Sequence, residues 1–337
     1  MLYPLARSLL FRLDPETAHT LSLQALDRAA RCGLVSPGQV IHTRPRTVMG
    51  LNFANPLGIA AGLDKNATCI AGLGALGVGF IEVGTVTPRP QNGNPRPRVF
   101  RLPEVEGLIN RLGFNNHGVD ALVEMVKERN YDGVLGINLG KNFDTPLEQA
   151  AADYLAGLRR VAPYADYVTI NISSPNTQNL RQLQGNDTLP PLLRALHDER
   201  QRLEQTRGRP LPIAIKIAPD LNESALDDIA RILVEEKMDA VIATNTTLSR
   251  DDITGQPHAQ EAGGLSGAPL HARSVEVVSH LARTLSGALP IIGVGGITSA
   301  SRAQAMLEAG ASLIQVYTGL IYRGPPLIEE ILATDRP

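Results

Sequence analysis

The sequence predicts an α/β protein in which eight parallel strands close into a (β/α)8 TIM barrel, preceded by an N-terminal helical extension. Eight short apolar, β-branched runs alternate with longer segments of helical periodicity, and such alternation is typical of parallel sheets. A chain of 337 residues is long enough for one barrel of this kind. An open doubly wound sheet would show the same alternation, but it seldom has eight strands.

The predicted strands occupy residues 56–61, 79–84, 133–138, 167–171, 212–217, 240–244, 290–295 and 312–317. Helical patterns lie between them. In residues 118–129, four apolar side chains share one helix face: Val119, Leu122, Val123 and Val126. Residues 298–310 carry helix caps at both ends, with Thr298 or Ser299 at the start and Gly310 after the last turn.

Composition excludes several classes of protein. The net charge is -2 with a pI near 6.4, so no basic surface for nucleic acid is expected. The seven histidines show no metal-ligand spacing, so we expect no metal site. Cys32 and Cys69 form no C-x-x-C pair and indicate reduced thiols. No apolar run approaches the roughly 20 residues of a spanning helix, and Arg7 and Arg12 interrupt the pattern of a secretory signal. We therefore expect a protein of the cytoplasm.

The active site of a barrel lies at the carboxyl ends of its strands. There the sequence places mainly amides, hydroxyls, lysines and glycines: Asp64, Lys65, Thr85, Asn138, Asn171, Lys216, Thr244, Asn245, Gly295, Gly296, Tyr317 and Thr318. Lys216 lies within the apolar run "IAIKIAP", where an unpaired ammonium is costly. We expect it to face an anion or an electron-rich ligand in the barrel mouth.

Glycine-rich segments near the last strands predict a phosphate site. "GVGGI" (293–297) and "YTG" (317–319) follow the seventh and eighth strands, and "GGLSG" (263–267) precedes them. Backbone N–H groups in such loops can approach a phosphate closely. By contrast, "GLGALG" (72–77) matches the dinucleotide fingerprint G-x-G-x-x-G but leads into a strand, so we interpret it as a helix end and turn. "GK" (140–141) likewise lacks the remainder of a phosphate-binding P-loop.

The amides suggest the shape of a ligand. Amides do not titrate, but their paired donors and acceptors can hold a flat heterocycle such as a pyrimidine, and four are suited to this: Asn110, Asn171, Asn176 and Asn245. A second ligand with a phosphate and an electron-accepting ring would explain the glycines and Lys216, because a lysine stabilises the negative charge that a flavin gains on reduction.

Taken in order, the motifs resemble those of the quinone-dependent (class 2) dihydroorotate dehydrogenases. The resemblance covers nearly the whole chain and rests on "AAGLDKN" (60–66), "VGTVTPRPQNGNPRPRVFR" (83–101), "INRLGFNN" (109–116), "NISSPNT" (171–177), "IKIAPD" (215–220), "ATNTT" (243–247), "GGLSG", "IIGVGGI" (291–297) and "YTGLIYRGP" (317–325). It implies an FMN enzyme of pyrimidine (UMP) biosynthesis that oxidises (S)-dihydroorotate to orotate and reduces a membrane quinone.

The resemblance also implies roles for individual residues. One FMN per chain would be held by Ala61, Gly62, Leu63, Asp64, Lys65, Thr85, Asn138, Asn171, Lys216, Thr244, Gly267, Gly296, Tyr317 and Thr318. Dihydroorotate would be held by Lys65, Asn110, Arg111, Leu112, Gly113, Phe114, Asn171, Asn176, Asn245 and Thr246. Thr318 stands where the family frequently has serine, and either hydroxyl could meet the phosphate.

"NISSPNT" contains the residue that matches the catalytic base of the family, Ser174, where another class has cysteine. The resemblance implies that Ser174 removes the C5 proton as hydride leaves C6 for flavin N5, with Thr177 and Phe114 as neighbours in a proton relay. A serine is a weak base, so it requires a closed, dry site. From the residues alone, a serine beside Pro175 that only forms a turn is an equal alternative.

Residues 1–40 precede the catalytic domain, which we place at 41–337. Leu2, Leu5, Leu9 and Leu13 recur at helical spacing, as do Ala18, Leu21, Ala25 and Ala29, and "DPET" (14–17) divides the two sets with Pro15 at a first helical position. Periodicity alone fits equally a helical plug under the barrel or helices on a bilayer surface. The resemblance favours the second, with a mouth through which quinone reaches the flavin and with His19 and Arg101 in that passage. It implies peripheral attachment to the cytoplasmic side of the cell inner membrane. The sequence leaves self-association open, with a monomer as one possibility.

Three other functions remain possible from the residues. A hydroxyacid oxidase on the same fold would need a histidine base and paired arginines, which the strand ends lack. A phosphate-binding aldolase or isomerase would use Lys216 as a Schiff-base nucleophile. A barrel that only binds a ligand is the third.

Overall fold

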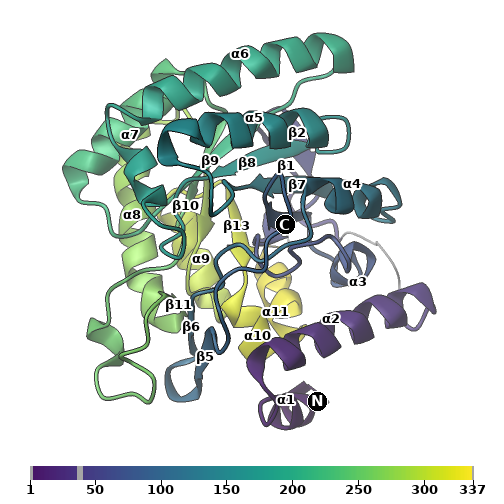
Figure 1. The fold of residues 1–337 in the computed structure, drawn as a ribbon. Coiled ribbons are helices and arrows are strands. Elements are labelled where there is room, and N and C mark those ends of the chain that lie inside the picture. Colours follow the sequence, from purple (N-terminus) through teal and green to yellow (C-terminus); the bar gives the residue numbers. More distant parts are fainter. Residues whose placement is uncertain (1–2, 36–40, 336–337) are drawn as a thin grey trace.

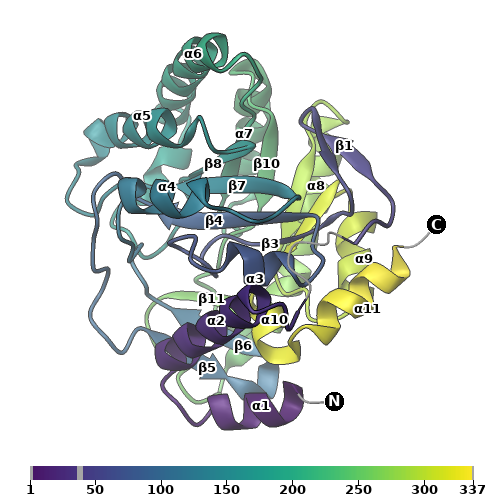
Figure 2. The same ribbon diagram turned by 90° about the vertical axis from the view of Figure 1, so that its right-hand side faces the viewer.

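The computed structural model describes residues 3–35 and 41–335, and its centre is a closed barrel of eight parallel strands (Figures 1 and 2). Around the barrel the strands follow the order of the chain: β3 (Leu57–Ile59), β4 (Phe80–Val86), β7 (Val134–Leu139), β8 (Tyr167–Asn171), β9 (Ile213–Ile217), β10 (Ala240–Ala243), β12 (Ile291–Val294) and β13 (Leu313–Val316). Each coincides with a predicted strand to within one or two residues at either end. The (β/α)8 prediction is therefore confirmed.

Helices surround the barrel: α3 (Ile70–Gly74), α4 (Val119–Lys127), α5 (Ala150–Val161), α6 (Leu189–Arg207), α7 (Glu223–Glu235), α8 (His271–Leu285), α9 (Ala300–Glu308), α10 (Thr318–Arg323) and α11 (Pro326–Thr334). Short 3-10 turns join them: η1 (Pro103–Val105), η2 (Leu147–Gln149), η3 (Leu180–Gln184), η4 (Asp251–Ile253) and η5 (Ala268–Leu270). The predicted face of α4 is buried. Ser299, rather than Thr298, caps α9 by accepting a hydrogen bond from the Arg302 N–H.

The apolar core has two layers. The larger layer lies between the barrel and its helices, and the smaller one fills the amino-terminal part of the barrel interior. A hairpin of β1 (Arg46–Val48) and β2 (Leu51–Phe53) closes that end, where the Phe53 ring meets Phe80 edge-to-face at 5.3 Å between centroids. Ligand access is therefore left to the opposite end, where the strands end.

A three-stranded antiparallel sheet stands at the carboxyl end of the barrel, in the order β11 (Gly264–Gly267), β6 (Gly107–Asn110) and β5 (Val99–Leu102). It joins the connection after β4 to the connection after β10. The sequence analysis did not predict this sheet, because its four-residue strands are too short to show a period and one of them pairs with a segment far away in the chain.

The N-terminal extension forms α1 (Tyr3–Leu10) and α2 (Pro15–Arg31), divided at Asp14, which caps α2. Both helices lie on the carboxyl-terminal side of the barrel (Figure 2), where α1 contacts α10 and α2 contacts β5 and α3. The Tyr3 hydroxyl donates to the Ile321 carbonyl at 2.7 Å and Arg7 donates to the Tyr322 carbonyl at 2.8 Å. Leu2 and residues 36–40, at the predicted domain boundary, lie outside the described residues.

The packed face of α2 differs from the predicted stripe. Ala18 and Ala30 are buried and Leu23 and Leu26 pack against the core, whereas Leu21 of the predicted stripe is 46% exposed. The crossing with α3 is close: a Cβ at Gly72 would lie 2.9 Å from the Asp27 backbone nitrogen. "GLGALG" is thus a structural helix end, as interpreted from the sequence.

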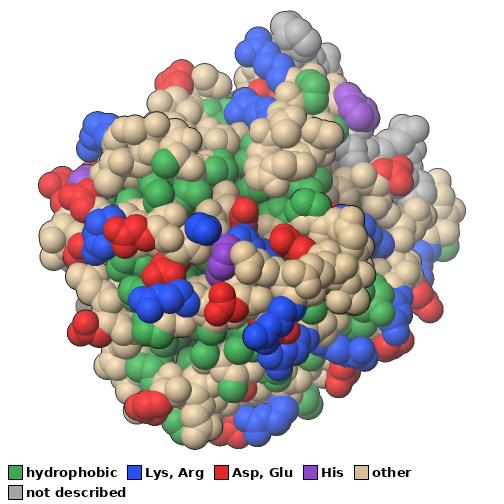
Figure 3. Space-filling view, turned by 90° about the horizontal axis from the view of Figure 1, so that it is seen from above, with side chains coloured by type: hydrophobic (Ala, Val, Ile, Leu, Met, Phe, Trp, Pro, Cys, Tyr) green, Lys and Arg blue, Asp and Glu red, His purple; other side chains and the backbone are tan. Residues whose placement is uncertain are grey.

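Charges of both signs are interspersed on the face shown in Figure 3, which is seen from above Figure 1. Pairs such as Arg194 with Glu236 and Arg159 with Glu199 join neighbouring helices. Within the part of the chain that the structure describes, no helix combines the length and apolarity that crossing a bilayer requires.

Candidate active site

A cavity opens at the carboxyl ends of the barrel strands, with about 950 Å³ of empty space counted to its open mouth. It gathers most of the residues that the sequence analysis singled out: Ala61, Gly62, Lys65, Thr85, Asn110, Leu112, Gly113, Phe114, Asn171, Ser174, Asn176, Lys216, Thr244, Asn245, Thr246, Gly267, Gly296, Tyr317 and Thr318.

Five of the predicted site residues do not line this cavity: Leu63, Asp64, Arg111, Asn138 and Thr177. The Asp64 carboxylate turns away and accepts hydrogen bonds from the Thr68 and Cys69 N–H groups, while Leu63 faces a neighbouring cavity. Arg111 pairs with Glu261 at 2.7 Å and lies over the Phe100 ring. Asn138 and Thr177 are buried.

Other lining residues were missed, among them Leu270 and Gln315. Gln315 lies in the apolar run "SLIQVY" and Glu82 in "GFIEVG". Each is a lone polar residue within a buried strand, which is the same signal that identified Lys216. That signal could have found both.

Glu82 is fully buried inside the barrel, and its carboxylate accepts three hydrogen bonds. Oε1 accepts from Asn138 Nδ2 at 2.8 Å, while Oε2 accepts from the Tyr167 hydroxyl at 2.8 Å and from Gln315 Nε2 at 2.9 Å. An ionised carboxylate can only accept, so each neighbour must turn a donor toward it. Gln315 Oε1 is therefore directed away from Glu82; it is buried and has no partner among the described residues.

This constraint extends to the cavity wall. With its NH2 group on Glu82, Asn138 turns its oxygen to the Thr85 hydroxyl, which donates to it at 2.6 Å. Thr85 Oγ1 then accepts from Asn171 Nδ2 at 3.0 Å. Asn171 Oδ1 in turn accepts from the Ser173 hydroxyl at 3.0 Å and from Asn245 Nδ2 at 3.3 Å. One carboxylate thus determines the orientation of a row of amides.

Lys216 is buried, lines the cavity and makes no hydrogen bond with any described residue. Burial lowers the pKa of its ammonium from the ordinary value, and the negative charge of Glu82 opposes that shift. The ammonium is the cationic group on the inner wall, and Glu82 is the charge that compensates it in this low-dielectric interior.

The cavity ends among the glycine-rich loops. The N–H groups of Gly296, Thr318 and Gly319 donate to no described residue, and the Ser266 and Thr318 hydroxyls lie 2.8 Å apart. Gly296 has φ 65°, and a Cβ there would lie 2.8 Å from the Gly267 carbonyl oxygen. The positive φ of glycine permits this close turn. Free N–H groups and hydroxyls together are suited to an anion such as a phosphate.

Ser174 lies in the turn after β8 and is buried. Its Oγ accepts from the Asn176 N–H at 3.2 Å, and Asn176 Nδ2 contacts Asn110 Oδ1 at 3.2 Å. Among the described residues, no group of histidine, cysteine, aspartate and glutamate side chains is arranged to hold a metal ion.

A second cavity adjoins the first, with about 2440 Å³ of empty space counted to its opening. Residues of α1, α2, β5, β6 and α10 line it, including the predicted passage residues His19 and Arg101. Lys65, Leu112 and Tyr317 line both cavities and form the partition between them. Burial, together with the nearby positive charge of Lys65, lowers the pKa of His19 to about 4.

A closed barrel with a large cavity at its strand ends, a buried lysine, converging amides and an anion-binding end has the features of an enzyme active site. Comparison with known proteins identifies the family. The model of the family "Dihydroorotate dehydrogenase" matches residues 45–334, and the chain belongs to this family.

Relatives cover nearly the whole chain. A protein of Burkholderia cenocepacia named dihydroorotate dehydrogenase (quinone) is 59% identical over 98% of this chain and 96% of its own length. A protein of the same name from Methylobacillus flagellatus is 58% identical over 99% of both chains. Among solved structures, that of the Eimeria tenella dihydroorotate dehydrogenase in complex with ferulenol is 38% identical, with a TM-score of 0.86 over 95% of this chain and 90% of that one. The resemblance inferred from the motifs is confirmed.

Coupling between Glu82 and Lys216 can be measured in a double-mutant cycle. We expect Glu82→Gln to lower the free energy of unfolding by about 3–5 kcal/mol, because it leaves a buried ammonium uncompensated. In a Lys216→Met background the same substitution should cost at least about 1 kcal/mol less. Urea unfolding of the four proteins gives both values. Equal costs in the two backgrounds would mean that Glu82 acts only through its three neutral donors.

Proposed function

We propose that this protein oxidises dihydroorotate to orotate in pyrimidine biosynthesis, with FMN as the cofactor and a membrane quinone as the electron acceptor. The proposal rests on one observation above all. The residues that match the family motifs, including Ser174, Lys216 and the asparagines, converge on one cavity in a chain 58–59% identical to proteins named for this reaction.

The cavity fits FMN at three places. Free N–H groups and hydroxyls at Gly296, Thr318 and Ser266 suit the phosphate. The ammonium of Lys216 suits the edge of the flavin ring that gains negative charge. Gln315 Oε1 is a buried acceptor without a partner among the described residues, and it suits a donor of the cofactor. FMN, when bound, supplies a two-electron acceptor for the hydride that leaves C6 of dihydroorotate.

Substrate recognition is assigned to the amides and to Lys65. Asn110, Asn171, Asn176 and Asn245 present paired donors and acceptors, which suit the two amide edges of a dihydropyrimidine. Lys65 supplies a positive charge for the substrate carboxylate. Thr246 Oγ1 is buried without a partner among the described residues and is available to the same ligand.

Ser174 is assigned as the base that removes the proton from C5. The C5–H bond breaks toward Ser174 Oγ as the C6–H pair leaves as hydride, and the C5–C6 double bond of orotate forms. The Asn176 N–H that points at Ser174 Oγ stabilises negative charge on that atom. Phe114 is assigned to exclude water beside the site and Thr177 to pass the proton onward, and both side chains are buried.

The second cavity is assigned to the quinone. Its walls include apolar side chains such as Leu10, Phe11 and Leu63, and it reaches the partition that carries Lys65 and Tyr317. A pKa of about 4 keeps His19 neutral near pH 7, which suits an uncharged quinone. We assign residues 1–40 to this entrance.

The apolar side chains of the extension are assigned to contact with the inner membrane from its cytoplasmic side. Leu5, Leu9 and Leu13 are 70%, 64% and 41% exposed, and Arg12 lies beside them in the chain. An amphipathic helix with exposed leucines and nearby basic residues can lie in the interface of a bilayer without crossing it.

Visible absorbance tests the central proposal. We expect purified protein to be yellow and to bleach when dihydroorotate is added without quinone. Ser174→Ala should retain FMN but bleach about 10²–10⁴ times more slowly, because it lacks the general base. Stopped-flow absorbance of both proteins gives the rates. A colourless protein, or one that stays yellow with dihydroorotate, would refute the proposed function. Near-normal bleaching of Ser174→Ala would refute only the assignment of Ser174 as the base.

Ligand affinity should depend on the charge of Lys65. Burial lowers the pKa of this lysine to about 8, although Glu16 opposes the shift. The ammonium is charged below that pKa and neutral above it, so the affinity for the orotate anion should fall as pH rises through about 8. Titration of the flavin spectrum with orotate at several pH values measures it. Lys65→Met should bind orotate weakly, and its affinity should not fall as pH rises through about 8. If that variant shows the same fall in affinity, another group is responsible for it.

Membrane contact can be separated from catalysis at the flavin. We expect Leu5→Asp combined with Leu9→Asp to weaken sedimentation with phospholipid vesicles and to slow reduction of a long-chain quinone in them. Bleaching by dihydroorotate should be unchanged, because neither side chain is buried. Val234→Asp, at an exposed position of α7, is the control. Unaltered sedimentation of the double variant would contradict the assignment.

A further inference from the structure

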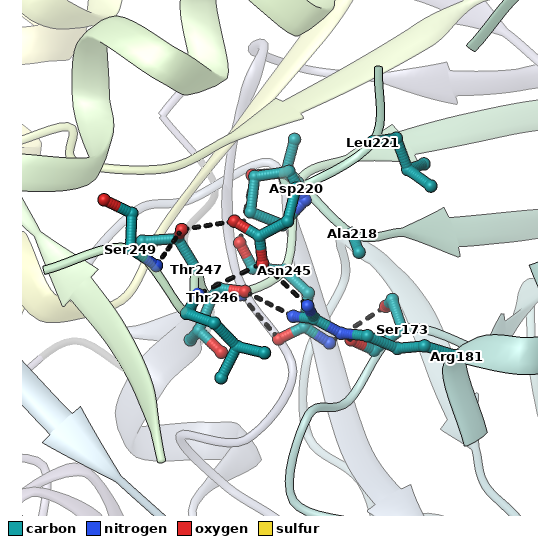
Figure 4. Close-up of polar contacts among 12 residues, drawn as sticks. Ser173, Arg181, Ala218, Asp220, Leu221, Asn245, Thr246, Thr247 and Ser249 are labelled. Atoms are coloured by element: carbon teal, nitrogen blue, oxygen red, sulfur yellow. Dashed lines mark hydrogen bonds and ion pairs between the residues drawn. The ribbon is translucent and has the colours of Figure 1, made fainter. Parts of the chain in front are cut away.

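Three loops at the barrel mouth meet at one guanidinium, that of Arg181 in η3 (Figure 4). Nε donates to the Ser173 carbonyl at 3.0 Å, in the loop after β8. Nη2 donates to the Thr246 carbonyl at 2.8 Å, in the loop after β10. Nη1 donates to Asp220 at 2.6 Å, in the loop after β9. A planar fork of this kind reaches acceptors in three directions from three separate nitrogens, whereas a lysine donates from a single nitrogen.

Asp220 holds the guanidinium in place. Besides Arg181, its carboxylate accepts from the Thr247 hydroxyl and from the Leu248 N–H at 3.1 Å (Figure 4). The Arg181 and Asp220 side chains are 21% and 27% exposed. An ion pair so close to water contributes little to stability. The role of the Arg181–Asp220 pair is therefore better judged from its geometry than from its contribution to stability.

The contact with Ser173 acts directly on the base. The Ser173 carbonyl belongs to the peptide unit whose nitrogen is that of Ser174, and this unit is planar. A hydrogen bond that fixes the Ser173 carbonyl therefore also fixes the orientation of the peptide plane that contains the Cα of Ser174. The Thr246 carbonyl ties the opposite loop, which carries Asn245 and Thr246 into the cavity, to the same guanidinium.

We propose that Arg181, held by Asp220, is a positioning residue that sets the distance between Ser174 and the substrate wall formed by Asn245 and Thr246. This inference rests on the proposed function. Arg181 does not line the cavity and acts only through the two carbonyls. A base displaced by about 1 Å can lose roughly 10²-fold in rate, so loosening the two loops should affect proton removal far more than ligand binding.

The experiment compares Arg181→Lys with wild type in the FMN-loaded protein. Lysine retains the charge and the partner Asp220 but cannot hold both carbonyls. We expect FMN content per chain to be unchanged, the affinity for orotate to stay within about threefold, and bleaching by dihydroorotate to slow about 10–100-fold. Because proton removal becomes slower, the isotope effect with C5-deuterated dihydroorotate should rise. A purely structural residue would change the melting temperature without changing that isotope effect.

Arg207→Lys is the matched control. Arg207 also donates to two backbone carbonyls, those of Ala165 and Pro210, but before β8 and β9, at the opposite end of the barrel. We expect its bleaching rate and isotope effect to equal those of wild type. If Arg207→Lys slows bleaching as much as Arg181→Lys does, the effect is general loosening and the inference is wrong.

The remaining outcomes are also decisive. If wild type bleaches and Arg181→Lys matches it in rate and isotope effect, the inference fails and the proposed function stands. If wild type does not bleach, the proposed function itself fails. If Arg181→Lys loses FMN or does not fold, Asp220→Asn replaces it, since it leaves the arginine in place but weakens its anchor. That variant should be several-fold slower with a raised isotope effect, and wild-type values would overturn the inference.

Discussion

The polar interior of the barrel depends on one buried carboxylate. Glu82 accepts from three side chains and donates to none, so it determines which way Asn138 and Gln315 face, and through Thr85 it determines the orientation of Asn171. Amides could otherwise adopt either of two nearly isosteric orientations. A site that recognises a ligand by its donor and acceptor pattern needs one orientation, and here a charge at the base of the network provides it.

The loops at the carboxyl end of the barrel are held by a different kind of contact. The barrel strands are held by closure of the sheet and by apolar packing on both of its faces. The loops after β8, β9 and β10 are in addition joined to one another by side chains, through Arg181 and Asp220. The amide of Asn171 thus stands at the end of a barrel strand, whereas Ser174 and Asn245 lie in loops that contact one another.

The N-terminal helices combine two roles in one short segment. They dock by polar contacts, including the pair of Glu16 with Arg98 at 2.8 Å and the bonds of Tyr3 and Arg7 to α10. Leu5 and Leu9 of α1 remain on the surface. The same docking encloses a cavity that shares Lys65, Leu112 and Tyr317 with the barrel mouth. Docking of the two helices thus encloses this cavity and leaves apolar side chains of α1 exposed at the surface.

The sequence by itself determined the barrel, because eight buried strands and their helices each carry a local period, and it identified most cavity residues, because the carboxyl ends of parallel strands must meet at one face. It did not reveal the β5–β6–β11 sheet or the face on which α2 packs, since these depend on segments distant in the chain. Glu82 and Gln315 could have been found as lone polar residues in apolar strands. Arg181 could not, because only the tertiary structure decides which carbonyls an arginine on a loop will reach.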